Sequence, residues 1–259
     1  MPLLSIIIPN YNYGRFFYRI AHALNRQTLD LRNVELILAD DGSTDDSREQ
    51  AATLSALSVH SFTSLWLDHC GCPGSVRNAG LERASGQYLL CLDPDDIPAP
   101  GYLEACIVAL KMHSEADISY TDFFIQEDGE TRAVALPDFL PELLAVQNIL
   151  PPAAMMHRKV WEKTDGYRDN TAYEDWDLWV RAAHAGFSGI RVGTPLFTHM
   201  VHGENFSFDA RQDDARAKAA IVLNTPEFFA EDVCHWARGI MAGESWAESF
   251  PRGLIPRAG

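Results

Sequence analysis

Residues 89–96 read Leu89-Leu90-Cys91-Leu92-Asp93-Pro94-Asp95-Asp96, and the predicted architecture is built outward from them. The four apolar residues are typical of a short buried strand, and three carboxylates follow its C-terminal end in a turn. Ligands of open α/β sheets bind just beyond the carboxyl ends of the strands. Carboxylates this close together repel one another, and a divalent cation is the usual reason for such a cluster. The stretch predicts a Mg²⁺ or Mn²⁺ site facing a substrate's phosphates, with an acidic solvated turn as the alternative.

Strand and helix patterns alternate before this stretch. Strands are predicted over residues 3–8, 34–39, 59–67 and 89–92, and helices over residues 16–27, over residues 73–86 and after Thr44. This alternation predicts an α/β fold, a Rossmann-like, mostly parallel, doubly wound sheet with helices on both faces. The turns at residues 9–11, 40–41 and 93–96 then lie at the same edge of the sheet, so three strand ends meet at one crevice.

The alternation weakens beyond residue 98, where we predict a fused second lobe and then C-terminal helices. Strands are expected over residues 117–125 and 188–198, helices over 102–113, 142–146, 159–163, 174–185, 209–223 and 228–241, and a loop over 199–207. The last residues, which include Pro251 and Pro256, are predicted to fray.

Composition and charge exclude several function classes. The chain has 259 residues, of which 47% are hydrophobic, enough for one large domain or two fused lobes. Its formal net charge of −15 repels nucleic acids and anionic lipids, so we expect no nucleic-acid partner and at most peripheral membrane contact. No apolar run approaches the roughly 20 residues that span a bilayer, and the first residues lack a signal-peptide pattern.

The five cysteines are an odd number without the spacing of a disulfide framework. They indicate reduced thiols and therefore a cytoplasmic protein. The segment His69-Cys70-Gly71-Cys72 resembles half of a zinc site. No second Cys or His pair follows at a suitable spacing, so we do not expect zinc there.

Four blocks of sequence resemble the family 2 glycosyltransferases, in the same order as in that family. The blocks are Ser5-Ile6-Ile7-Ile8-Pro9-Asn10-Tyr11-Asn12, Asp40-Asp41-Gly42-Ser43-Thr44-Asp45, the segment from Gly74-Ser75-Val76-Arg77-Asn78-Ala79-Gly80 through residues 84–86 to 92–96, and Tyr173-Glu174-Asp175-Trp176-Asp177-Leu178-Trp179. The resemblance covers residues 3–207 and implies the GT-A fold, with transfer of a sugar from a nucleotide diphosphate donor and inversion at the anomeric carbon. It divides the chain into a nucleotide-sugar-binding half (1–98), an acceptor-binding and catalytic-base half of the same domain (99–207), and a C-terminal helical extension (208–259).

On the donor side, the resemblance assigns Pro9, Tyr11 and Asp41 to the nucleotide. Asp41 matches the carboxylate that accepts the N3–H of uracil, a group that thymine shares. UDP-sugars are therefore the favoured donors and dTDP-sugars come next, while guanine could pair with both carboxylate oxygens and GDP stays open. A helix-capping turn is the alternative for Asp41. Arg77 either faces the nucleotide or pairs with the acidic turns.

The resemblance also implies a cation, Mn²⁺ or Mg²⁺, that stabilises the charge on the leaving diphosphate. Asp96 is the expected direct ligand, while Asp95 would reach the metal through water or contact the ribose. His202 matches a loop histidine that reaches the metal or diphosphate. Many members have Tyr-Arg before that position where this chain has His199-Met200, so either histidine could act.

On the acceptor side, the resemblance implies that Asp175 is the catalytic base. Glu174 would orient the acceptor or cap the helix, and both carboxylates could instead simply favour the positive end of the helix dipole. Trp176 is placed on the acceptor side, where it could stack on a sugar, although core packing is the alternative. Residues 164–167 depart from the family's Gly-Gly-Phe-Asp pattern, which leaves the acceptor open between a saccharide and a lipid-linked glycan.

Two other function classes are alternatives to a glycosyltransferase. A nucleotide-sugar-binding module without transferase activity is the main alternative, although every named carboxylate is present. An NAD-dependent oxidoreductase would need a glycine-rich turn after the first strand, and Pro9-Asn10-Tyr11-Asn12 is not one. The aromatic residues of the C-terminal segment could touch the inner face of a membrane, form a homodimer contact or belong to the core.

Overall fold

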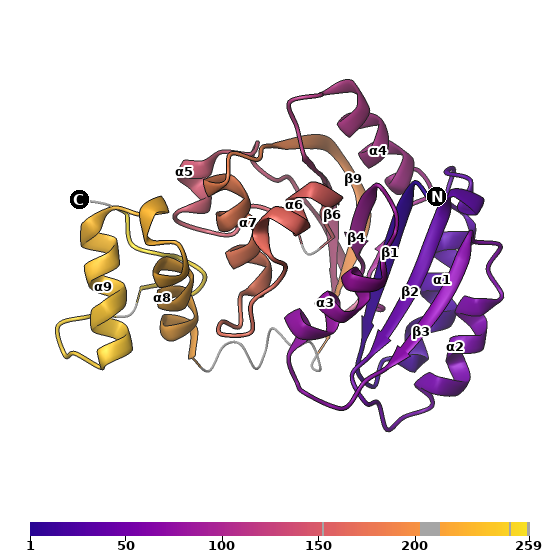
Figure 1. Ribbon diagram of the computed structural model, residues 1–259, viewed down its shortest axis with the longest axis horizontal. Helices are drawn as coiled ribbons and strands as arrows, with labels where there is room; N and C mark the ends of the chain where they lie inside the picture. The colour runs from indigo at the N-terminus through magenta and orange to yellow at the C-terminus, as the bar shows by residue number, and fades with distance from the viewer. Residues whose placement is uncertain (152, 203–212, 249, 258–259) are drawn as a thin grey trace.

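The computed structural model describes residues 1–151, 153–202, 213–248 and 250–257 (Figure 1). In this part of the chain, nine strands form one sheet in the order β3-β2-β1-β4-β8-β6-β9-β5, with β7 paired to β6. The strands are β1 (Leu4–Asn10), β2 (Val34–Asp40), β3 (Ser61–Trp66), β4 (Tyr88–Cys91), β5 (Ile97–Pro98), β6 (Ile118–Glu127), β7 (Glu130–Val134), β8 (Met155–His157) and β9 (Gly189–Val201).

The first half of the sheet is parallel and doubly wound, as predicted. Alternate residues of β1 pack on opposite faces because side chains alternate along a strand. Ile6 and Ile8 pack with Phe17 of α1 (Phe17–Asn25), whereas Ile7 packs with Leu81 of α3 (Pro73–Arg83). Figure 1 shows α3 on one side of these strands, with α1 and α2 (Ser47–Ser55) on the other. The helices therefore cover both faces and leave the carboxyl ends of the strands open for a site.

The second half of the sheet is mixed and contains both parallel and antiparallel pairs. β8 runs antiparallel to both β4 and β6, β9 is parallel to β6, and β5 is antiparallel to β9. The short strands β5 and β8 were not predicted, because two or three residues are too few to show the alternation of apolar and polar side chains that is typical of a strand. The hairpin strand β7 was missed because its residues are mostly polar and exposed.

The helices of the second half lie close to their predicted positions. They are α4 (Tyr102–Met112), α5 (Pro141–Leu144), α6 (Arg158–Thr164), α7 (Glu174–His184), α8 (Asp214–Asn224) and α9 (Glu231–Ala242). The helix predicted from residue 209 begins at Asp214 in the described chain, and residues 209–212 lie outside it. The predicted loop over 199–207 begins as part of β9, and residues 203–207 also lie outside the described chain.

The C-terminal helices pack against each other at the end of the molecule away from β1 to β3 (Figure 1). The prediction of a frayed tail is wrong for residues 250–257. Ile255 is buried and its N–H donates to the carbonyl of Val146, while the buried Lys218 donates to the carbonyls of Phe250 and Pro251. None of the described helices is both long and apolar enough to span a membrane.

Candidate functional site

The acidic turn after β4 meets the end of β9, which brings residues about a hundred positions apart into contact. Nδ1 of His199 lies 2.8 Å from Oδ1 of Asp96, and Nε2 of His202 lies 3.0 Å from Oδ2 of Asp95. The sequence left open which histidine reaches this turn. In the structure both do, each with its own carboxylate.

The pKa values in this cluster are shifted because its charges are buried. Burial, followed by repulsion from Asp96 and Asp93, raises the pKa of Asp95 to about 8. Burial also raises the pKa of Asp96. For His199 burial acts in the opposite direction, but the nearby carboxylates prevail, Asp96 foremost, and raise its pKa to about 9. The cluster therefore favours a positive charge next to the two aspartates.

These residues fit a divalent cation. Asp96 is fully buried, and its Oδ2 atom has no hydrogen-bond partner among the described residues. Two neighbouring carboxylates are the hard oxygen ligands that Mg²⁺ and Mn²⁺ prefer. In the described chain no three or more Cys, His, Asp or Glu residues form a complete metal cage, so a cation here would need further ligands from water or a diphosphate.

Asp41 lies at the end of β2, where it holds the loop that precedes α3. Its two carboxylate oxygens accept from the N–H groups of Cys70 and Gly71, at 2.8 and 2.9 Å, and Nδ1 of His69 lies 2.9 Å from Oδ2. The His69 ring stacks on Tyr11 with centroids 4.2 Å apart. The helix-capping alternative is therefore not what the structure shows, since Asp41 supports residues 69–71. Apart from the His69-Cys70-Gly71-Cys72 motif, no sequence pattern indicates this role of the loop.

The Pro9–Tyr11 turn leaves Tyr11 half-exposed beside Asp41, while Pro9 is buried within β1. Asn10 was not predicted, although it joins the two turns. Its Nδ2 donates to Asp40 at 2.6 Å and to Ser47 at 2.9 Å. A carboxylate has about four lone-pair sites, so Asp41 can still accept a further hydrogen bond from a base stacked near Tyr11.

Arg77 of α3 pairs with the acidic turns, the second of its two predicted roles. Its Nη2 donates to Asp93 at 3.0 Å, and Nη1 donates to Glu174. Burial opposes the charge of Arg77, but Asp93 and Glu174 together raise its pKa well above the usual value. The guanidinium therefore joins the turn after β4 to the start of α7. Glu174 is engaged in this ion pair at the first residue of α7.

Asp175 is the second residue of α7, beside this ion pair, and remains partly exposed. Its Oδ2 accepts from Asn148 at 2.9 Å, and Oδ1 accepts from the N–H of Trp176 at 2.7 Å. Burial raises the pKa of Asp175, although Arg77 and these two hydrogen bonds oppose the shift. A positioned carboxylate with a raised pKa has the properties of a general base.

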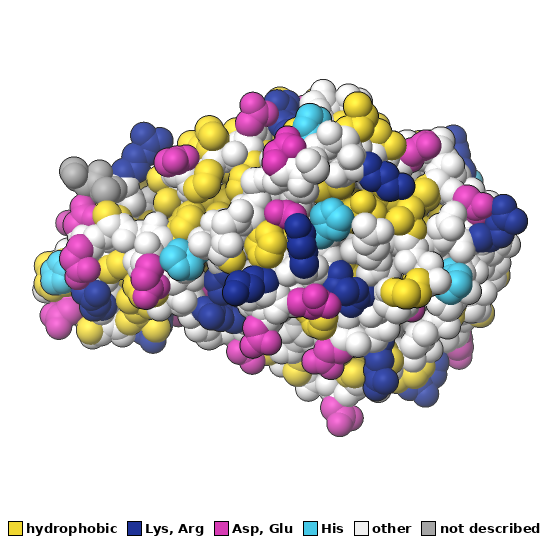
Figure 2. Space-filling model, turned by 45° about the horizontal axis from the view of Figure 1, so that its top comes forward, with side chains coloured by type: hydrophobic (Ala, Val, Ile, Leu, Met, Phe, Trp, Pro, Cys, Tyr) yellow, Lys and Arg dark blue, Asp and Glu magenta, His cyan; other side chains and the backbone are white. Residues whose placement is uncertain are grey.

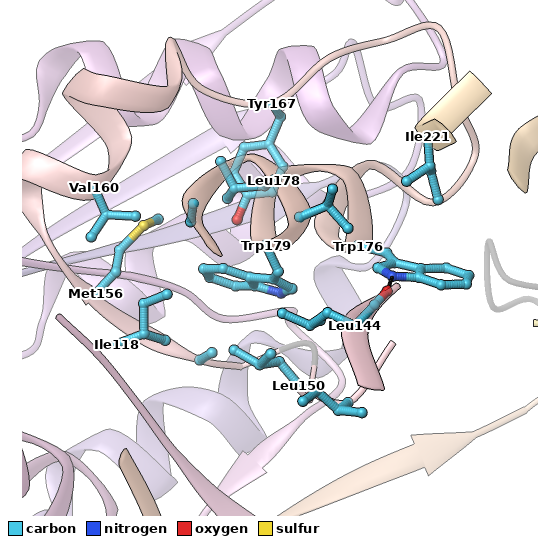
Figure 3. Packing of buried hydrophobic residues seen from close by; sticks show 14 of the residues in the cluster. Ile118, Leu144, Leu150, Met156, Val160, Tyr167, Trp176, Leu178, Trp179 and Ile221 are labelled. Carbon is cyan, nitrogen blue, oxygen red and sulfur yellow. Dashed lines mark hydrogen bonds between the residues drawn. The ribbon is translucent and has the colours of Figure 1, made fainter. Parts of the chain in front are cut away.

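Trp176 lies in the core rather than on the acceptor side, which corrects its predicted placement. Its side chain is 1% exposed, and its indole N–H donates to the carbonyl of Leu144 at 2.8 Å. Figure 3 shows Trp176 and Trp179 packed among the aliphatic side chains of the same cluster. No ring face of Trp176 is open to a sugar. The two tryptophans instead fix the helix that carries Asp175.

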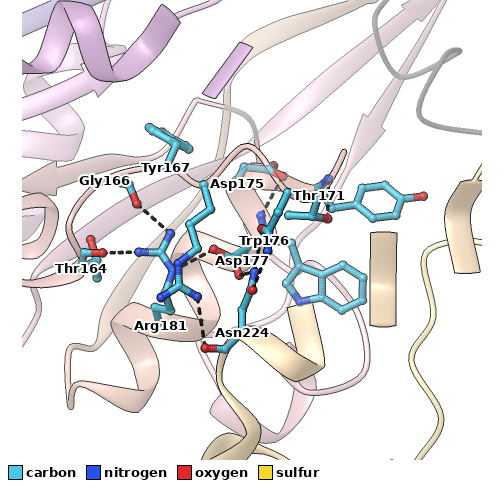
Figure 4. Close-up of polar contacts among 12 residues, drawn as sticks. Thr164, Gly166, Tyr167, Thr171, Asp175, Trp176, Asp177, Arg181 and Asn224 are labelled. Atoms are coloured by element: carbon cyan, nitrogen blue, oxygen red, sulfur yellow. Dashed lines mark hydrogen bonds and ion pairs between the residues drawn. The ribbon is translucent and has the colours of Figure 1, made fainter. Parts of the chain in front are cut away.

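A buried ion pair holds α7 from its other side (Figure 4). Nε of Arg181 donates to Asp177 at 2.8 Å, and the guanidinium also donates to the carbonyls of Gly166 and Thr164. Asn224 of α8 donates to the second oxygen of Asp177 at 2.7 Å. The network ties the start of α7 to the 164–166 turn and to the C-terminal helices.

Known proteins share sequence similarity with this chain. The model of the family described as "Glycosyl transferase family 2" matches residues 5–178. Chondroitin synthase of Pasteurella multocida (strain Pm70) is 28% identical over 229 residues, which are 86% of this chain but only 23% of that protein. The chain thus spans less than a quarter of that relative's length.

Two solved structures show the same fold. The first is residues 1–349 of S. aureus TarS in complex with UDP-GlcNAc, with a TM-score of 0.70, 19% identity and coverage of 94% of this chain and 71% of that one. The second is the mannosyltransferase PcManGT from Pyrobaculum calidifontis in complex with GDP-Man and Mn²⁺, with a TM-score of 0.66, 16% identity and coverage of 96% and 77%.

Proposed function

The chain belongs to glycosyl transferase family 2, and on this premise we propose that it is an inverting, metal-dependent glycosyltransferase. The donor is a nucleotide diphosphate sugar, with UDP-sugars favoured and dTDP-sugars next, and the acceptor is a hydroxyl of a saccharide or a lipid-linked glycan. A relative named for chondroitin synthesis and a structural neighbour that holds UDP-GlcNAc support this assignment. The neighbour that holds GDP-Man and Mn²⁺ supports a metal and keeps GDP-sugars open.

One observation carries the proposal: Arg77 joins two separate groups of carboxylates. Asp93 lies on one side of the guanidinium, in the turn that contains Asp95 and Asp96. Glu174 lies on the other side and is followed directly by Asp175. The proximity of these two carboxylate groups supports the proposal that one binds the diphosphate and the other supplies the catalytic base.

In the proposed reaction Asp175 takes the proton of the acceptor hydroxyl while that oxygen attacks the anomeric carbon. The bond from this carbon to the diphosphate oxygen breaks on the opposite face, which inverts the configuration. Asp95 and Asp96 would hold Mn²⁺ or Mg²⁺, which supplies positive charge to the leaving diphosphate. Asp41 and Tyr11 would hold the nucleobase of the donor at the far end of the crevice.

The test uses two variants and one matched control. Asp175→Asn keeps the shape of the side chain but removes the base, so transfer is expected to fall by about 10²- to 10⁴-fold while nucleotide binding remains. Asp96→Ala is expected to abolish the metal-dependent rise in melting temperature with a nucleotide. Asp169→Asn changes an exposed carboxylate nearby and is expected to alter neither property.

Melting curves with UDP, dTDP, GDP and CDP, with and without Mn²⁺, identify the donor class. A nucleotide at about 100 times its dissociation constant adds roughly 2.7 kcal/mol of stability. Product formation is then measured with the matching labelled nucleotide sugars and a library of oligosaccharides. If Asp175→Asn transferred sugar at the wild-type rate, the assignment of Asp175 as the catalytic base would be refuted. Binding without product on any acceptor would favour the nucleotide-sugar-binding module.

We further propose a cytoplasmic location with peripheral contact at the inner face of a membrane. The described cysteines are all unpaired, and the formal net charge is −15. Unpaired cysteines fit a reducing compartment, and the negative charge limits attachment to anionic lipid.

A further inference from the structure

A second hollow lies outside the donor crevice, between α1 and the strands β5, β6 and β9. Its volume is about 450 Å³, which is within the range of small-molecule sites. β5 directly follows the Asp95–Asp96 turn, and its Ile97 pairs with Thr198 of β9, the residue before His199. The hollow therefore adjoins the candidate metal site, but none of the residues assigned to that site lines it.

The α1 wall of the hollow is cationic. Arg19, His22 and Arg26 all line it; Arg19 and His22 lie three residues apart on one face of α1, and Arg26 is the residue that follows the helix. No Asp or Glu is among the lining residues, although the chain has 36 acidic residues against 21 Lys and Arg. On the face shown in Figure 2, by contrast, acidic and basic side chains are intermixed.

Some arginines of the described chain are paired with a carboxylate, whereas Arg19 and Arg26 have no such partner there. Arg32 pairs with Asp30, and Arg191 pairs with Asp122. In the described part of the chain no ion pair involves Arg19 or Arg26, and the Arg19 guanidinium donates to the sulfur of Met200 at 4.0 Å. Two guanidinium groups that face a hollow without a counter-charge can bind a dianion with several oxygen atoms.

The opposite wall is apolar. It consists of side chains from β5, from the turn after it, and from β6 and β9, namely Ile97, Pro98, Ala99, Pro100, Phe124, Pro195 and Phe197. A free inorganic anion would leave this wall in contact with water. A ligand with a charged head and a hydrocarbon body would cover both walls.

We propose that this hollow binds a phosphate monoester that carries an apolar substituent, with the phosphate on Arg19, His22 and Arg26 and the substituent against Phe124 and Ile97. The ligand comes either from a lipid headgroup or from a soluble phosphate ester. The site is independent of the proposed transferase activity.

Calorimetric titration of the intact chain with octyl phosphate, below its micelle concentration, tests the site. One-to-one saturable binding is expected. Arg19→Ala/Arg26→Ala is expected to weaken it at least about tenfold, because hydrogen bonds to charged groups are lost. The control is Arg83→Ala, another exposed arginine in the last turn of a helix without an ion pair in the described chain, and it should bind as wild type.

Three further ligands separate the contribution of the phosphate from that of the alkyl tail. Inorganic phosphate lacks the tail, octanoate lacks the second negative charge, and octyl glucoside is uncharged. Each should bind at least about tenfold more weakly than octyl phosphate. Sedimentation with phosphatidylcholine vesicles, with or without phosphatidic acid, then identifies the source. Phosphatidic-acid-dependent binding that the double variant loses indicates a lipid, and its absence indicates a soluble ester.

The proposal is overturned if octyl phosphate does not bind saturably, or if the double variant binds it as well as Arg83→Ala does. Equal binding of octyl glucoside would also overturn it, since the arginines would then contribute nothing. All three substitutions are at exposed positions, and a melting curve for each variant confirms that it is folded.

Discussion

Replacing Arg181 by Met should strongly destabilise the protein, because it breaks a buried ion pair outside the crevice. The side chain is 7% exposed, and burial lowers the pKa of its guanidinium although Asp177 opposes that shift. Arg181→Met leaves Asp177, which is fully buried, with only Asn224 as a hydrogen-bond donor among its side-chain contacts described above. It also removes the donors to the carbonyls of Thr164 and Gly166.

The magnitude follows from the cost of a buried charge that has lost its partner. Breaking such a pair from one side costs about 3–5 kcal/mol. For a chain of this size each kcal/mol lowers the melting temperature by about 2–4 °C, so a drop of roughly 6–20 °C is expected. Adding Asp177→Asn removes the orphaned charge, and the double variant should recover part of the loss.

Urea denaturation and calorimetry measure both quantities. The matched control is Arg238→Met on α9, where an exposed arginine pairs with Glu231 and solvent screens the pair, so that it contributes little to stability. If Arg181→Met lost no more stability than Arg238→Met, the network would not be what holds α7. A double variant less stable than Arg181→Met alone would show that the orphaned charge is not the cause of the loss.

Three other predictions concern packing, pH and the C-terminal tail. Gly80→Ala would place a Cβ atom 2.5 Å from a methyl carbon of Ile7 in β1, and it should lower the free energy of unfolding by about 1–3 kcal/mol, measured by urea denaturation. The control Gly193→Ala places its Cβ atom no closer than 3.9 Å to another residue and should lower that free energy by less than about 1 kcal/mol. The hydrogen bond from Arg191 lowers the pKa of Asp122 below 3.8, so its stabilisation is present above that pH and is lost as the pH falls through the lowered value. Asp122→Asn should therefore flatten the acid limb of the stability curve, and an unchanged limb would contradict this. Lys218→Met should expose residues 250–257 to proteases before the rest of the chain, and simultaneous cleavage of both regions would argue against a separate role in holding the tail.

The N-terminal half could be predicted because its strands are buried on both faces. Such strands are continuous aliphatic runs, as in residues 3–8 and 34–39, and the polar turns that follow them must lie at one edge of the sheet. That reasoning located the Asp93–Asp96 turn and the neighbouring turns at residues 9–11 and 40–41. The second half of the sheet could not be predicted in the same way, since strands as short as β5 and β8 are defined by their partners rather than by a local pattern.

For individual side chains, too, some properties were set by the local sequence and others only by the tertiary structure. The sequence by itself determined which residue types stand at the strand ends and at the start of α7, and hence the candidates Asp41, Asp96 and Asp175. Only the tertiary structure decided that both His199 and His202 reach the acidic turn, that Arg77 is held by two carboxylates, and that Trp176 belongs to the core. The physical reason is that burial and ion pairing depend on atoms brought together from positions far apart in the chain, whereas strand ends and helix starts are set by neighbouring residues.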